Sequence, residues 1–224
     1  MMTARNAARA VGVLVLAQGI GGYVTNFVLL GPVFAPPGFL VNAASHAERL
    51  GVSVLIGMAT GALATAVAIT VLPHFRKYSE SMALWLLALA IASLALAVVE
   101  NGKVMSLLSL SQAYAASNAT DPAAYQSLRG VVAASRNWAH FTQLIVSGAT
   151  LFVFYLTTFR FALIPRALAA FGMAAFVLQM ATVSLPFFGG RIIFPLLAPA
   201  GIANLALAAW LLARGFSDKP LASK

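Results

Sequence analysis

Polar side chains recur on one face of a long apolar segment in the second half of the chain. Arg136, His140, Gln143, Ser147 and Thr150 follow one another at intervals of four, three, four and three residues. In an α-helix this spacing places all five on one face, in a stripe about 21 Å long. Ionisable residues inside a membrane cost about 2.5–3.5 kcal/mol each on insertion scales, and they face the interior of a helix bundle. If the segment crosses a membrane, the stripe predicts a polar site inside the protein.

Polar and charged residues also occur near the end of an earlier apolar segment, at Glu100, Asn101 and Lys103. Glu100 can pair with Lys103 three residues later on the same helix, or with Arg136 on the other segment. Burying Arg136 without a partner is the more costly arrangement, so we predict a pair between Glu100 and Arg136. With Lys103 and His140 nearby, the group would carry a surplus of positive charge. That surplus suits an anionic headgroup or a carboxylate.

The residues that we expect to line a polar cavity fall at a similar depth in the predicted membrane helices. This ligand-binding set consists of Asn26, Glu100, Lys103, Arg136, His140 and Gln143. Three roles stay open for it: hydrogen bonding that joins helices, binding of a small anionic amphiphile or lipid in an outward-facing cavity, and acid–base catalysis by Glu100 or His140. The first role also fits an accessory subunit that contacts a protein partner in a larger membrane complex.

Several specific chemistries lack the residues that they need. The chain has no cysteine, which removes disulfides and thiolate catalysis. His46 and His74 lie outside the predicted spans, so His140 has no second histidine for haem ligation. No cluster of His and Glu has the spacing of a zinc site. Ser147 lies about 10 Å along the helix from His140, too far for a nucleophile and its base. We therefore expect no metal and no cofactor, and we assign no catalytic residue.

The composition indicates that lipid surrounds most of the chain. Hydrophobic residues make up 61% of the sequence and charged residues 8%, with a mean hydropathy of +0.91. A soluble domain carries about 25% charged residues. The net charge of +9 does not indicate nucleic-acid binding, because such a surface gathers its basic residues on one soluble face. Here they are spread singly between apolar runs, and we expect no nucleic-acid partner.

Six stretches are long enough to cross a bilayer, which needs about 20 apolar residues in a helix. Backbone groups cannot stay unpaired in lipid, so the fold class is all-α: a polytopic membrane protein with a six-transmembrane-helix bundle in a single transmembrane domain, residues 1–224. The predicted helices are 10–30, 50–72, 82–101, 131–158, 167–187 and 194–213. Residues 102–117 either extend the third helix or lie along the membrane surface.

The beginning of the chain resembles a secretory signal peptide, because Arg5 and Arg9 precede an apolar run. That run continues to Leu30, which is long enough to span a membrane. We therefore expect a retained first helix.

The distribution of basic residues predicts the orientation. Positively charged loops stay in the cytoplasm. With the N-terminus inside, nine basic residues are cytoplasmic and four are external, Lys103 being counted with neither side. The cytoplasmic residues are Arg5, Arg9, Arg76, Lys77, Arg160, Arg166, Arg214, Lys219 and Lys224; the external ones are Arg49, Arg129, Arg136 and Arg191. We expect a bacterial inner-membrane protein with both termini in the cytoplasm.

Three short motifs resemble those of a known family. They are Arg9-Ala10-Val11-Gly12, Leu163-Ile164-Pro165-Arg166 and Trp210-Leu211-Leu212-Ala213-Arg214-Gly215. Together they resemble the uncharacterised bacterial membrane family known as domain of unknown function 4386, over nearly the whole chain. This chain has Asn204 where the family pattern has an acidic residue, and Phe161-Ala162 where it has Ser-Gly. The resemblance implies a membrane fold and adds no mechanism.

Overall fold

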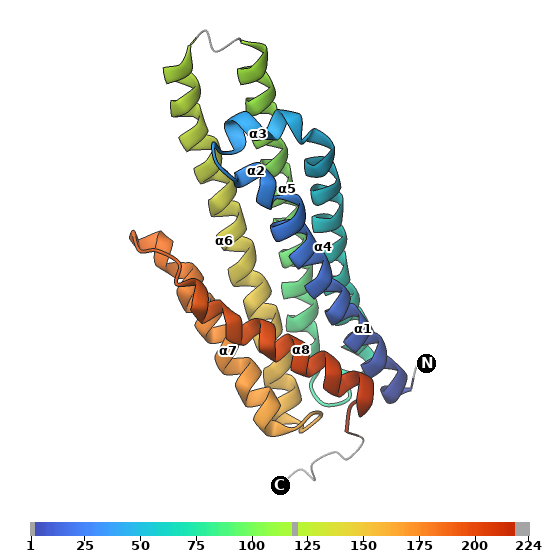
Figure 1. Ribbon diagram of the computed structural model, residues 1–224. Coiled ribbons are helices and arrows are strands. Elements are labelled where there is room, and N and C mark those ends of the chain that lie inside the picture. Colours follow the sequence, from blue (N-terminus) through green and yellow to red (C-terminus); the bar gives the residue numbers. More distant parts are fainter. Residues whose placement is uncertain (1–2, 118–120, 218–224) are drawn as a thin grey trace. The chain divides into compact units, whose positions relative to one another are not determined.

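The computed structural model describes residues 3–117 and 121–217, and these residues form helices and no strands. The order of the helices can be followed in Figure 1. They are α1 (Ala4–Tyr23), α2 (Gly31–Phe34), α3 (Phe39–Ser45), α4 (Ala47–Phe75), α5 (Glu80–Ala116), α6 (Pro122–Arg160), α7 (Arg166–Ser184) and α8 (Ala198–Ala213). A π-helical turn, Val24–Leu29, joins α1 to α2, and 3-10 turns, Leu185–Phe188 and Phe194–Leu197, lie between α7 and α8.

Six segments of the described residues are long and apolar enough to cross a membrane, as the sequence predicts. They are Ala4–Phe34, Ala47–Phe75, Glu80–Ala116, Pro122–Arg160, Arg166–Phe188 and Phe194–Ala213. The all-α prediction and the number of spans are therefore confirmed. The third and fourth helices run beyond the predicted ranges 82–101 and 131–158, and residues 102–116 continue α5. Residues 118–120, Lys219 and Lys224 lie outside the described residues.

The extensions of α5 and α6 have identifiable causes. Val104 and Leu107 are buried on one face of α5, in an apolar cluster that also contains Val33. Tyr125, in the first turns of α6, packs its ring 5.3 Å from that of Tyr114, and its hydroxyl donates to a carbonyl of α5 at 3.1 Å. Because these contacts bury apolar surface on both extensions, the helices continue past the residues that hydropathy alone selects.

The described residues fall into two compact units. The first comprises Met1–Gly19, Ala62–Leu94 and Leu144–Lys224, and the second comprises Ile20–Gly61 and Ala95–Gln143. Helices α1, α4, α5 and α6 each contribute residues to both units. Each unit has its own cluster of buried apolar side chains. That the chain forms a single transmembrane domain stays a prediction.

The core of the first unit is built around Tyr155 on α6. Its side chain is fully buried, and its hydroxyl donates to the carbonyl of Ala203 on α8 at 2.9 Å. The ring packs directly on Gly172 of α7, where any side chain would collide with it. Past the end of α6, Ala162 has a positive φ of 50°. This left-handed conformation strains residues that carry a Cβ, and it falls where the resembled family pattern has glycine.

In the second unit, the first span does not continue as a regular helix. After the π-helical turn and α2, the chain reverses and enters α3, and Asn42 closes the reversal by donating to the carbonyl of Ala35 at 2.8 Å. Ser111 of α5 then holds α3, because its hydroxyl donates to the carbonyl of Leu40 at 2.9 Å and accepts from the amide of Ala44 at 2.8 Å. These bonds fix the end of α2, which carries Phe34.

Candidate functional site

Three of the predicted site residues meet in the second unit. The guanidinium of Arg136 donates through Nη2 to Oε1 of Glu100 at 3.1 Å. Nδ1 of His140 lies 2.7 Å from the same oxygen. The side chains are mostly buried, with exposed fractions of 15% for Glu100, 13% for Arg136 and 23% for His140. The predicted pair between Glu100 and Arg136 is confirmed. We call these three residues the polar cluster.

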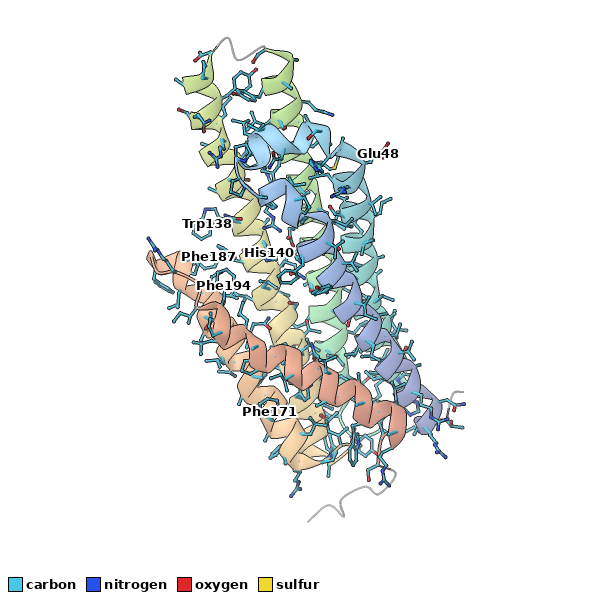
Figure 2. The ribbon with its side chains drawn as sticks, in the orientation of Figure 1. Glu48, Trp138, His140, Phe171, Phe187 and Phe194 are labelled. Carbon is cyan, nitrogen blue, oxygen red and sulfur yellow. The ribbon has the colours of Figure 1, made fainter. Side chains whose placement is uncertain are left out.

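Helical spacing explains how two residues of α6 reach one residue of α5. Arg136 and His140 are four residues apart, so their side chains emerge from the same face one turn from each other. Glu100 lies on α5, and its Oε1 is within hydrogen-bonding distance of both. His140 is labelled on α6 in Figure 2. An oxygen that accepts two hydrogen bonds from cationic or polar donors is well satisfied, which lowers the cost of burying the carboxylate.

The chemistry of the carboxylate determines the protonation of one histidine nitrogen. An ionised Glu accepts hydrogen bonds but donates none. Nδ1 of His140 therefore carries the proton and donates to Glu100. In the neutral imidazole, Nε2 is then left with a lone pair; in the protonated imidazole it is a second donor. Either way, Glu100 orients His140 so that Nε2 is the nitrogen available for another group.

Arg136 retains one donor that nothing in the described structure satisfies. Its Nε is buried and has no hydrogen-bond partner. The guanidinium carbon lies 5.9 Å from the centre of the Phe34 ring, an arrangement in which the ring attracts the cation. Sequence reasoning missed Phe34, because the path of α2 brings it to Arg136 and no local pattern signals that path. The buried Nε marks a place where a ligand atom or a water can accept a hydrogen bond.

The remaining predicted residues are placed differently. Lys103 is half-buried, one turn after Glu100 on α5, and has no hydrogen bond or ion pair within the described part of the chain. Gln143 is half-buried, three residues after His140 on α6. Asn26 is exposed, and its amide donates to the carbonyl of Gly22, four residues earlier near the end of α1, at 2.9 Å. Lys103 and Gln143 therefore border the polar cluster along its two helices, whereas Asn26 uses its donor locally.

Asn101 has a packing role next to the cluster. It is buried, with an exposed fraction of 8%, and its amide donates to the carbonyl of Ala97 at 2.8 Å. A Cβ added to Gly57 of α4 would lie 2.6 Å from Oδ1 of Asn101. Only a glycine at position 57 allows α4 to approach this side chain so closely.

The polar stripe continues past Gln143 into the first unit, where its residues serve the helix itself. The hydroxyl of Ser147 donates to the carbonyl of Leu144 at 3.1 Å, and that of Thr150 donates to the carbonyl of Val146 at 2.8 Å. Such bonds satisfy hydroxyl groups inside a helix. The buried donor of the stripe that has no hydrogen-bond partner within the described residues is therefore Nε of Arg136.

The polar cluster offers two kinds of chemistry. Arg136 pairs with Glu100, and Lys103, one turn along α5 from Glu100, adds a second positive charge that would attract an anion. The oriented Nε2 of His140 can accept or donate a hydrogen bond, or move a proton. Among residues 3–117 and 121–217, no group of three or more His, Asp or Glu side chains could hold a metal ion.

Six membrane-spanning helices with ionisable residues buried among them define a multi-pass helical membrane protein. Residues 10–215 match the family described as Domain of unknown function (DUF4386). The match covers most of the sequence, and the chain belongs to this family, as its three short motifs indicate. No curated protein and no solved structure matches it. The family description assigns no activity.

Proposed function

We propose that this membrane protein binds the anionic head of a small amphiphile or lipid at the polar cluster. The observation that carries the proposal is the buried Nε of Arg136, which has no hydrogen-bond partner. Leaving such a donor unsatisfied costs about 1–3 kcal/mol, and more for a charged group. A carboxylate or ester oxygen at this position would accept from Nε and recover that free energy.

The neighbouring groups favour an anionic head with an attached apolar part. Glu100 engages Arg136 through Nη2 only, so other donors of the guanidinium remain for a ligand. Lys103 is half-buried one turn after Glu100 on α5, and it adds a second positive charge. The exposed surface of the spans is largely apolar, as lipid contact requires. A ligand with a charged head and an alkyl tail satisfies both environments.

The proposal includes an orientation and a location. Nine basic residues against four favour cytoplasmic termini, in the inner membrane of a bacterium. With this orientation α5 runs outward and α6 runs inward, and the polar cluster falls in the outer half of the membrane. A ligand would then enter from the external side.

Acid–base chemistry is a second candidate function, favoured by the 2.7 Å contact between Glu100 and His140. A carboxylate that orients an imidazole through Nδ1 leaves Nε2 placed to accept or give a proton. The two candidates differ in the fate of the bound molecule. A binding protein releases its ligand unchanged, whereas an enzyme releases a product of different mass.

The experiment compares the amphiphiles retained by three purified full-length proteins: wild type, Arg136→Lys and Arg129→Lys. Lysine keeps the positive charge beside Glu100 but lacks Nε, so Arg136→Lys tests the donor and not the charge. Arg129 lies two turns earlier on α6 and donates to the exposed Gln126, which makes its replacement a matched control. Losing one charge-assisted hydrogen bond of about 1.5–3 kcal/mol predicts at least about tenfold less of one anionic species in Arg136→Lys.

Mass spectrometry of organic extracts measures this difference. We expect the wild type and Arg129→Lys to retain the species equally. If all three proteins carry the same amphiphiles in the same amounts, the ligand proposal fails and the polar cluster has a structural role.

A further inference from the structure

A second group of basic side chains lines an open pocket in the first compact unit. The pocket has a volume of about 470 Å³ and lies where α6 leads into α7 and where α8 ends. Arg166, Trp210 and Arg214 contribute its large polar side chains, and residues 162–165 and 215–217 complete the wall. None of these residues belongs to the polar cluster.

The pocket lies at the ends of two membrane spans. Arg166 is the first residue of the span Arg166–Phe188, and Arg214 follows the last residue of the span Phe194–Ala213. The ends of spans reach the level of the lipid headgroups, where tryptophan is enriched because its ring is apolar and its N–H is polar. Trp210 is half-buried and packs partly against the apolar core of this unit.

Specific contacts hold the pocket wall in place. The amide of Ser217 donates to the carbonyl of Leu163 at 2.8 Å, which ties the segment after α8 to the loop before α7. Gly215 reverses the chain with a φ of +78°, a conformation that glycine adopts without strain. Phe216 is then buried, with its ring 6.1 Å from that of Phe75. The two arginines therefore project from an anchored backbone.

The charge in this pocket is not compensated within the described residues, where neither arginine has an acidic partner. The guanidinium of Arg166 lies over the ring of Phe159 at 6.0 Å, which leaves its N–H edge free to donate. Arg5 is close as well, because a Cβ added to Gly215 would lie 3.6 Å from its Cγ. Asp218 lies outside the described residues.

We propose that this pocket binds a phosphate group, carried by an anionic phospholipid or present as free phosphate. Two guanidinium groups can each donate paired hydrogen bonds to phosphate oxygens. Basic pockets between membrane helices at the headgroup level recognise lipid phosphates in this way. Trp210 would contact the glycerol and the first carbons of an acyl chain. The site is independent of the polar cluster, and each proposal can fail without the other.

Native mass spectrometry of the full-length protein in detergent tests the proposal with two probes. Phosphatidylglycerol is titrated in one arm and inorganic phosphate in the other, and the mass of the adduct identifies the source of the phosphate. The pocket variant is Arg166→Gln with Arg214→Gln. The control variant is Arg9→Gln with Arg160→Gln, which removes the same charge from two exposed residues of the same unit that do not line the pocket.

Each basic residue near a membrane surface contributes about 1 kcal/mol to the binding of an anionic lipid. Two of them predict that the pocket variant binds phosphatidylglycerol about 30-fold more weakly, while the control stays within about threefold of the wild type. An adduct formed with inorganic phosphate alone, and lost in the pocket variant, would assign a soluble phosphate instead. The proposal is overturned if the pocket variant and the control variant bind phosphatidylglycerol equally weakly, or if neither phosphatidylglycerol nor inorganic phosphate forms an adduct. If the double variant does not fold, each single variant predicts a loss of about fivefold.

Discussion

Replacing Glu100 with glutamine perturbs the polar cluster with the smallest change in shape. Glutamine keeps an oxygen at the position of Oε1 but removes the negative charge to which Arg136 and His140 donate. Hydrogen bonds to a charged group contribute about 1.5–3 kcal/mol, and neutral ones about 0.5–1.5 kcal/mol. Two weakened bonds therefore lose about 2–3 kcal/mol.

Arg136 also loses its counter-ion in a site where its side chain is only 13% exposed. Breaking a buried pair by removing one partner costs about 3–5 kcal/mol, which sets the upper limit. We expect Glu100→Gln to lower the free energy of unfolding by about 2–5 kcal/mol. For a chain of this size, each kcal/mol shifts the melting temperature by about 2–4 °C.

The assay is thermal unfolding of the purified protein in detergent, with Lys103→Gln as the control. Lys103 lies on the same helix but has no hydrogen bond or ion pair among the described residues, so its replacement should change the stability by less than about 0.5 kcal/mol. The reasoning is refuted if Glu100→Gln melts no lower than Lys103→Gln. It is supported further if adding Arg136→Met to Glu100→Gln restores stability, because removing both charges also removes their desolvation cost.

Three further predictions concern topology and backbone packing. Reporter fusions at Arg76 and Arg166 should read cytoplasmic, and fusions at Asn118 and Gly190 should read external. An external reading at the C-terminus would reject the orientation. Gly57→Ala should lower the melting temperature, because its Cβ would lie 2.6 Å from Oδ1 of Asn101. Gly19→Ala, whose Cβ would have nothing within 4 Å, should raise the stability by about 0.5–1 kcal/mol. Equal changes in the melting temperatures of the two variants would contradict the close packing at Gly57. Ala162→Gly should stabilise the protein by about 0.5–1 kcal/mol, because glycine adopts the positive φ at this position without strain. A lower melting temperature of this variant in the same assay would show that the conformation is not strained.

The membrane spans could be predicted because lipid imposes one strong requirement on the sequence. A helix that crosses a bilayer needs about 20 apolar residues, and the six predicted segments meet that requirement. The helix ends were harder to predict. Residues 102–116 mix polar and apolar side chains, so their helical state depends on the burial of Val104 and Leu107, which is a tertiary contact that hydropathy does not contain.

The polar cluster was predictable where spacing and charge act together. The four-residue interval places Arg136 and His140 on one face, and the cost of an unpaired cation selects Glu100 as the partner. The shared oxygen was not predictable, because it depends on how α5 and α6 are rotated. The position of Asn26 was not predictable either. A π-helical turn occupies Val24–Leu29, and the amide of Asn26 donates to the carbonyl of Gly22 in the preceding helix α1.

Experimental density around Arg136 tests the central claim most directly. A density map of the purified wild type, obtained with the lipids and small molecules that remain bound to it, would show what the buried Nε contacts. The account predicts density that belongs to no protein atom, within hydrogen-bonding distance of Nε and continuing into an elongated apolar feature. A map in which a protein side chain fills this position, or only a single water molecule accepts from Nε, would contradict the account.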